Sequence, residues 1–270
     1  MSNDLSTAAI EGAFPERGRP LTYFDTVDST NQQALELLDR GALEGALVVA
    51  NQQTAGRGRR GRSWESPAGT GLLFSLILRP SAQDVLELLT TVLGVSVARA
   101  IQTRTGVVTQ LKWPNDVTVA DRKLAGILVE SRLSGGEIAG AVAGVGVNVS
   151  WPADEADEGL IASATSLEWI RLGDPNVSAT TRPELLAAIV TEFENIYARL
   201  EDTEIKEEVI QEASERSAIL GRQVVVRFAD GTSLEGRAKG LTPGGALQVE
   251  LPDGRTETLT VGEVERVRPQ

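Results

Sequence analysis

The segment of residues 56–62, Gly-Arg-Gly-Arg-Arg-Gly-Arg, restricts the fold of this chain more than any other. It cannot enter a core, because its side chains are charged and its glycines raise the entropy lost on ordering. Arginine binds phosphate oxygens through two hydrogen bonds at a time. The segment matches neither the Walker pattern nor the dinucleotide fingerprint. From its residues alone it is a phosphate-binding loop, a flexible solvated basic turn or a nucleic-acid contact.

The composition excludes several kinds of chemistry. The 270 residues include no cysteine and no histidine, so disulfides, thiol catalysis, a serine-histidine triad and histidine-ligated metals are absent. No secretory signal and no stretch of the length that spans a membrane is evident, and we expect a cytoplasmic protein. The formal net charge of −12 argues against a broad DNA-binding face and favours a small phosphorylated ligand for the basic segment.

The pattern along the chain predicts an α+β body followed by a small all-β unit. We expect a loose leader over residues 1–20, a catalytic domain over 21–217 and a C-terminal domain over 218–270. Ser29 and Gln32 fit a capping box for a helix that stops at Gly41, and Thr181 with Glu184 fits another. The remaining expected elements are strands at 21–24, 43–50, 71–78, 107–113, 116–120, 123–132 and 138–149, helices at 82–105, 181–200 and 204–216, and short strands at 224–228, 233–238, 246–251 and 257–261.

Two further segments have both a structural and a functional interpretation. Trp113-Pro114-Asn115-Asp116 is an ordinary proline turn, yet Lys112, Asp116 and Lys123 cluster there beside Gly126, where a ligand could lie flat against the backbone. The sequence of residues 28–31, Asp-Ser-Thr-Asn, is an ordinary helix cap when taken alone.

Taken together, five segments resemble the motif set of biotin protein ligases, in that family's order and spacing. They are residues 24–31 (FDTVDSTN), 53–64 (QTAGRGRRGRSW), 112–116 (KWPND), 122–130 (RKLAGILVE) and 144–148 (GVGVN). The resemblance covers about residues 21–215. It implies a mixed or antiparallel sheet with helices packed on it, like the catalytic domain of class II aminoacyl-tRNA synthetases, plus an SH3-like C-terminal β-barrel. Too few residues precede Leu21 for the winged helix of bifunctional members, so we expect the monofunctional form.

The resemblance implies an enzyme that makes biotinyl-5′-AMP from biotin and ATP, then transfers biotin to one lysine of a carrier domain. Arg59, Lys123 and Asp116 are the implied catalytic residues, with Asp116 on the acceptor-lysine side. The implied biotin-binding residues are Ser29, Thr30, Asn31, Gln53, Arg57, Gly58, Arg59, Lys123 and Gly126. The implied ATP- or adenylate-binding residues are Arg59, Arg60, Arg62, Trp64, Asn115, Lys123 and Asn148.

The resemblance also implies substrates and partners. ATP arrives with Mg²⁺, for which no protein ligands are assigned. The partner is a biotin carboxyl carrier domain of acyl-CoA carboxylases, and we expect no DNA, no membrane and a monomer or weak homodimer. The alternatives are a lipoate or other acyl ligase, a DNA-binding regulator and a non-catalytic biotin-binding module.

Overall fold

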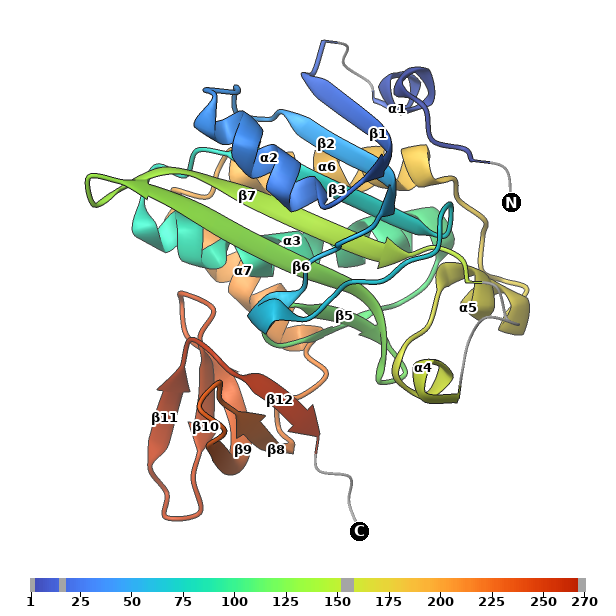
Figure 1. The fold of residues 1–270 in the computed structure, drawn as a ribbon. Helices are drawn as coiled ribbons and strands as arrows, with labels where there is room; N and C mark the ends of the chain where they lie inside the picture. The colour runs from blue at the N-terminus through green and yellow to red at the C-terminus, as the bar shows by residue number, and fades with distance from the viewer. Residues whose placement is uncertain (1–2, 15–17, 152–157, 267–270) are drawn as a thin grey trace.

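A seven-stranded mixed sheet forms the centre of the larger domain (Figure 1). The computed structural model describes residues 3–14, 18–151 and 158–266. The strand order is β1-β2-β3-β7-β6-β5-β4, with β1 parallel to β2 and the other neighbours antiparallel. These strands are β1 (Leu21–Val27), β2 (Leu47–Gln53), β3 (Gly71–Leu78), β4 (Gln110–Lys112), β5 (Asp116–Val119), β6 (Arg122–Ser134) and β7 (Glu137–Asn148). The expected α+β fold is confirmed.

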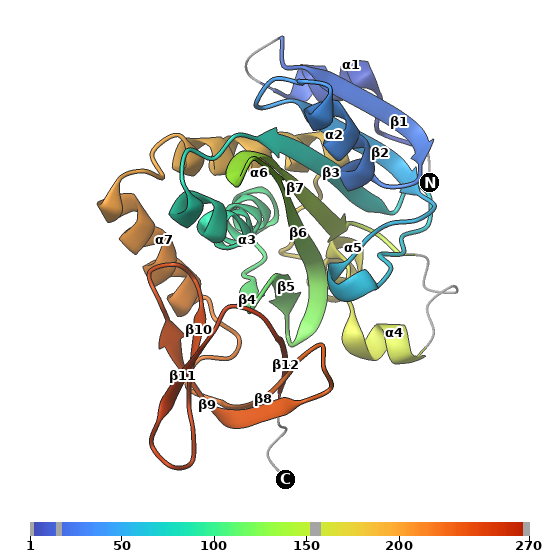
Figure 2. The same cartoon turned by 60° about the vertical axis from the view of Figure 1, so that its left-hand side comes forward.

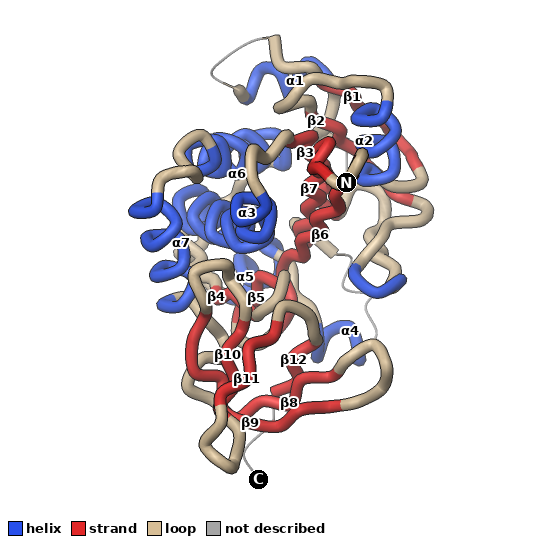
Figure 3. Tube along the Cα trace, turned by 90° about the vertical axis from the view of Figure 1, so that its left-hand side faces the viewer, coloured by secondary structure: helices blue, strands red, loops and turns tan. Residues whose placement is uncertain are grey.

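Helices cover both faces of the sheet, as the edge-on view of Figure 3 shows. Leu35 and Leu38 of α2 pack on Val48 and Ile77 on one face, while α3, α6 and α7 lie on the other. The described helices are α1 (Thr7–Ala13), α2 (Thr30–Asp39), α3 (Gln83–Thr105), α4 (Glu158–Ser163), α5 (Leu167–Gly173), α6 (Arg182–Tyr197) and α7 (Thr203–Glu215). None of them is both long and apolar enough to cross a bilayer.

Strand β3 is the best-buried strand of the sheet. Each of its eight residues, GLLFSLIL, is buried, as expected for a continuous apolar run with a layer on both faces. Phe74 and Leu76 enter the core shared with α3 and α6, and Ile77 faces α2. Ser75 is the one polar side chain in this run and is fully buried.

The two expected capping boxes have different outcomes. The box at α6 is confirmed: the Thr181 side chain accepts from the Glu184 backbone N–H, and Glu184 reaches back to the Thr181 N–H. The box at α2 is wrong, because Ser29 is the N-cap residue but makes no side-chain capping bond. Gln32 instead donates to Glu36, and Ser29 lies on the wall of a cavity.

The N-terminal segment differs from the expected loose leader. Helix α1 buries Ile10 completely, and Leu5 is also buried. The buried guanidinium of Arg182 donates to Asp4 through Nε at 2.6 Å and to Asn3 through a terminal nitrogen at 2.8 Å. This long-range anchor orders the described part of the leader. The leader's residues 1–2 and 15–17, and residues 267–270 of the expected C-terminal domain, lie outside the described residues.

The C-terminal domain is a five-stranded antiparallel sheet of order β11-β10-β9-β8-β12 that curls round its own core (Figure 2). Its strands are β8 (Gln223–Arg227), β9 (Ser233–Leu241), β10 (Leu247–Glu250), β11 (Thr256–Leu259) and β12 (Glu263–Arg266). The sequence did not predict β12. Trp113 of the larger domain packs against this small core and donates from its indole N–H to the Gly245 carbonyl at 3.1 Å.

Candidate active site

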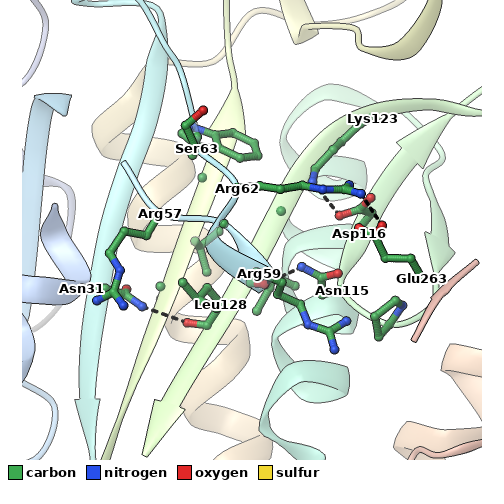
Figure 4. Close-up of a pocket in the computed structure, with 18 of the residues that line it drawn as sticks. Asn31, Arg57, Arg59, Arg62, Ser63, Asn115, Asp116, Lys123, Leu128 and Glu263 are labelled. Atoms are coloured by element: carbon green, nitrogen blue, oxygen red, sulfur yellow. Dashed lines mark hydrogen bonds and ion pairs between the residues drawn. The ribbon is translucent and has the colours of Figure 1, made fainter. Parts of the chain in front are cut away.

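A cavity of about 250 Å³ gathers the five motif segments. Its walls come from the start of α2, the end of β2, the arginine loop (residues 56–64), the 112–116 turn, the middles of β6 and β7, and β12 of the small domain (Figure 4). The predicted site residues that line it are Ser29, Thr30, Asn31, Gln53, Arg57, Gly58, Arg59, Arg62, Trp64, Asn115, Asp116, Lys123 and Gly126. Arg60 and Asn148 are the two predicted residues that do not line it.

One wall of the cavity is a chain of hydrogen-bonded polar side chains. The Thr30 backbone N–H and hydroxyl both donate to Gln53 Oε1, at 2.7 and 3.0 Å. The buried Ser75 hydroxyl lies 2.8 Å from the Thr30 hydroxyl and 2.7 Å from Asn31 Oδ1. Because every member is held by a neighbour, the wall presents fixed donors and acceptors, which suits a neutral polar head group.

Asn31 supports this wall more than it offers atoms to a ligand. Its amide donates to the Leu128 carbonyl at 3.2 Å and to Glu130 Oε2 at 2.9 Å, and its oxygen accepts from Ser75. A Cβ at Gly144 would overlap the Asn31 amide, so a glycine is required there. Asn31 therefore lies in the predicted place, with its polar groups already engaged by the protein.

The indole of Trp64 lies against a floor formed by two glycines. Gly126 and Gly146 are opposite each other in the β6–β7 pairing, and a Cβ on either would come within 2.8 Å of the Trp64 ring. The ammonium of Lys123 is 5.3 Å from the centroid of the same ring, within cation–π range. The glycines of β6 and β7 therefore leave room for an aromatic group on the sheet.

The charged groups of the cavity are only partly paired. Lys123 Nζ and Asp116 Oδ1 form an ion pair at 2.7 Å, whereas the guanidinium of Arg59 has no hydrogen bond or ion pair with any residue that the structure describes. Burial lowers the pKa of the Arg59 guanidinium, and the charge of Arg60 lowers it further. Lys112 also lines the cavity, next to Asp116 in the β4–β5 pairing. Arg59 is therefore a half-buried cation available to an anionic ligand.

The other arginines of the loop point to different neighbours. Arg57 forms an ion pair with Glu130 at 3.2 Å and turns toward Asn31, away from Lys123 (Figure 4). Arg62 pairs with Glu263 of β12, and Arg60 donates to the Arg227 carbonyl of β8 at 3.1 Å. The loop is thus held between the seven-stranded sheet and the small domain.

Asn148 and Asn115 both support strand β6. The Asn148 amide donates to the Lys123 carbonyl at 3.3 Å and to the Thr165 carbonyl at 3.1 Å, behind the cavity wall. The Asn115 side-chain amide donates to the Ile127 carbonyl at 2.8 Å, and the Asn115 backbone carbonyl accepts from the Ile127 N–H. These contacts fix the strand that carries Lys123 and Gly126.

Several residues of the site were not predicted from the sequence. Ser75 lies in an apolar run that is typical of a core strand. Its hydroxyl, the one polar side chain in that run, was the only indication of a role in the site. Glu263 and Glu265 are far away in sequence, on the strand that was not predicted. Glu130 belongs to a quoted motif and binds both Asn31 and Arg57, which only the three-dimensional contacts reveal.

Comparison with known proteins decides the family. The model of the Biotin/lipoate A/B protein ligase family matches residues 23–148, and that of the Biotin protein ligase C terminal domain matches residues 219–267. The Biotin–[acetyl-CoA-carboxylase] ligase of Paracoccus denitrificans is 34% identical over 240 residues, which are 88% of this chain and 96% of that protein. The chain belongs to the biotin protein ligase family.

Other members of the biotin protein ligase family agree with this assignment. The structure of the Aquifex aeolicus biotin protein ligase in complex with biotin and ATP matches with a TM-score of 0.77 and 29% identity, over 93% of this chain and 100% of that one. The Bifunctional ligase/repressor BirA of Bacillus spizizenii is 40% identical over 56% of this chain and 46% of its own length. The match therefore spans about half the length of that relative.

Proposed function

We propose that this chain forms biotinyl-5′-AMP from biotin and ATP and then transfers biotin to one lysine of a biotin carboxyl carrier domain. The observation that carries the proposal is one cavity that combines a fixed polar wall, an unpaired half-buried Arg59 and the Lys123–Asp116 pair. The wall suits a cyclic urea, and the cations suit a carboxylate that is becoming an acyl phosphate.

The head of biotin is assigned to Ser29, Thr30 and Gln53. The Ser29 side chain is free of the capping bond and buried on the cavity wall. A urea carbonyl needs donors and its two N–H groups need acceptors, which hydroxyls and an amide provide. Asn31 acts from behind this wall, through Ser75 and Glu130.

Adenylation is assigned to Arg59 and Lys123. The biotin carboxylate attacks the α-phosphorus of ATP, a new O–P bond forms and pyrophosphate leaves. Negative charge grows on the phosphoryl oxygens, and fixed cations at that point stabilise it. Lys123 already contacts Asp116, so it can exchange one anion for another without leaving the site.

Transfer is assigned to the side of Asp116. The acceptor amine attacks the acyl carbon, the bond to the phosphate oxygen breaks, and AMP leaves without needing a proton. Asp116 orients the arriving ammonium and is the candidate base for its proton, although an ordinary carboxylate is a poor acceptor for a proton from an ammonium group. Much of the acceleration then comes from positioning.

Mg²⁺ would arrive bound to ATP. No group of three or more acidic side chains suited to a metal ion occurs among the described residues. Phosphate oxygens and water are the ligands that Mg²⁺ usually keeps in nucleotide complexes. No step above is routed through the ion. The trapping of the adenylate is assigned to Arg62 and Trp64 of the loop and to Asn115 on the cavity wall, while Asn148 supports β6 from behind that wall.

The test is incubation with labelled biotin, ATP and a carrier domain, followed by mass analysis. We expect one added biotinyl group on the carrier, none without ATP and none on a carrier whose acceptor lysine is replaced by arginine. A parallel reaction with lipoate in place of biotin tests the alternative activity, lipoate ligation. Transfer of lipoate but not biotin, or no transfer at all, would overturn the proposal.

A further inference from the structure

The carboxylate of Glu130 serves two different parts of the site. Its Oε2 accepts from the Asn31 amide at 2.9 Å, and its Oε1 lies 3.2 Å from a terminal nitrogen of Arg57. The Glu130 side chain is 23% exposed, so this double contact is partly protected from water. One side chain on β6 thus touches both the start of α2 and the arginine loop.

On the pocket side, Glu130 is linked to the polar wall. Asn31 is buried, and its oxygen accepts from Ser75, whose hydroxyl also meets Thr30. A ligand that fixes Thr30 therefore fixes Asn31 through a chain of short hydrogen bonds. Asn31 in turn limits the positions open to the Glu130 carboxylate.

On the loop side, Glu130 holds the first arginine of the loop. Arg57 bridges to Ser63 across the loop, so its position sets the position of both loop arms. Among the ion pairs of the described residues, Arg57–Glu130 is the one that joins the loop to the seven-stranded sheet, since Arg62 pairs with the small domain. In Figure 4 Arg57 points toward Asn31, while Arg59 projects away from it.

We propose that Glu130 is a positioning residue that couples occupation of the biotin pocket to closure of the arginine loop. A filled pocket holds Asn31, Asn31 holds the carboxylate, and the carboxylate holds Arg57 and the loop over the ligand. The part of this proposal that concerns biotin binding rests on the proposed function. The contacts of Glu130 with Asn31 and Arg57 do not depend on it.

The expected size of the effect is moderate. Arg57 is 47% exposed, and solvent weakens an ion pair at such a site. The hydrogen bond from Asn31 already restricts the Glu130 side chain, so less side-chain entropy is lost when Glu130 pairs with Arg57. We expect loss of the pair to speed loop opening about 1.5- to 5-fold, the range of a partly exposed ion pair.

Two variants separate the two contacts of Glu130. Glu130→Gln keeps an oxygen that accepts from Asn31 but removes the charge that holds Arg57, whereas Glu130→Ala removes both contacts. Asp39→Asn is the matched control, because Asp39 pairs at 3.3 Å with Arg132, two residues along the same strand and away from the loop.

The first measurement uses the free protein and limited trypsin, with cleavage after the loop arginines followed by mass spectrometry. Glu130→Gln and Glu130→Ala should be cleaved there about 1.5- to 5-fold faster than wild type, and Asp39→Asn at the wild-type rate. The second measurement is release of preformed biotinyl-5′-AMP. Glu130→Gln should release it faster while its biotin affinity stays within about twofold, and Glu130→Ala should lose biotin affinity as well.

The outcomes distinguish this inference from the proposed function. If Glu130→Gln is cleaved and releases adenylate like wild type, Glu130 does not hold the loop. If Glu130→Gln loses biotin affinity as much as Glu130→Ala does, Glu130 shapes only the pocket and couples nothing. If wild type forms no adenylate, the proposed function fails, and cleavage of the free protein still tests the contact.

Discussion

The ammonium of Lys123 lies between an anion and an aromatic ring, 2.7 Å from Asp116 and 5.3 Å from the centroid of Trp64. Its backbone carbonyl accepts from Asn148, which fixes the start of β6. Such support matters, because an electrostatic contribution to catalysis depends on charges that need not move during the reaction. Lys123 and Asp116 form one pair, but the proposed reaction uses them at different moments.

Substitution of each partner should therefore affect a different half-reaction. Lys123→Ala should slow adenylate formation by about 10²- to 10³-fold, the usual scale for loss of one charge-stabilising group. Asp116→Asn should leave pyrophosphate release nearly intact and impair transfer to the carrier. Single-turnover adenylate formation and transfer from preformed adenylate measure the two steps. If Asp116→Asn slowed both steps equally, Asp116 would not belong to the acceptor side.

At the scale of elements, sequence patterns predicted the buried elements best. The apolar run of β3 was located at 71–78 as observed, and the helix expected at 82–105 is α3, Gln83–Thr105. Periodicity and caps are local properties, and these elements are long enough to show them. The four-residue β12 carries no such signal, and it pairs with β8, more than thirty residues earlier.

The errors arose where a distant contact outweighs local preference. Ser29 looks like a capping residue, but it lies on the cavity wall and its hydroxyl makes no cap. The leader looks loose, but Arg182 binds Asp4 across the chain. In the site, motifs placed Arg59, Lys123 and Asp116 together, whereas the links through Ser75 and Glu130 join segments that sequence spacing does not relate. The roles assigned to individual site residues remain predictions.

The cap of α6 permits a stability prediction. Thr181→Ala should lower the free energy of unfolding by about 1 kcal/mol at neutral pH, the usual loss for an N-cap hydroxyl. Hydrogen bonds from the Thr181 backbone N–H and hydroxyl lower the pKa of Glu184. The stabilisation from these bonds is therefore present above the ordinary glutamate pKa of about 4.3 and is lost as the pH falls through the lowered value.

Denaturant unfolding of wild type and Thr181→Ala at several pH values measures this difference. The gap between the two proteins should narrow in acid, because Glu184 becomes protonated in both. Ligase activity serves as the control, since α6 lies on the face of the sheet away from the cavity. A gap that widened in acid would contradict the role given to the Glu184 carboxylate.

At the scale of the whole molecule, the cavity belongs to both domains. Glu263, Val264 and Glu265 of β12 complete a wall that otherwise comes from the larger domain. The arginine loop contacts β8 and β12 through Arg60 and Arg62. The small domain is therefore part of the site and does not act only as an appended module.

The packing of Trp113 against the small core also has a calorimetric consequence. The indole packs against the core of the second domain while its own backbone belongs to the turn beside Asp116. Leu111 also exchanges backbone hydrogen bonds with Arg216 and Ala218 at the junction. Neither domain can melt without exposing apolar surface of the other, so heat capacity should show a single cooperative peak. Trp113→Ala should split that peak in two, with the small domain melting first. A single peak at an unchanged temperature would mean that the Trp113 side chain does not couple the unfolding of the two domains.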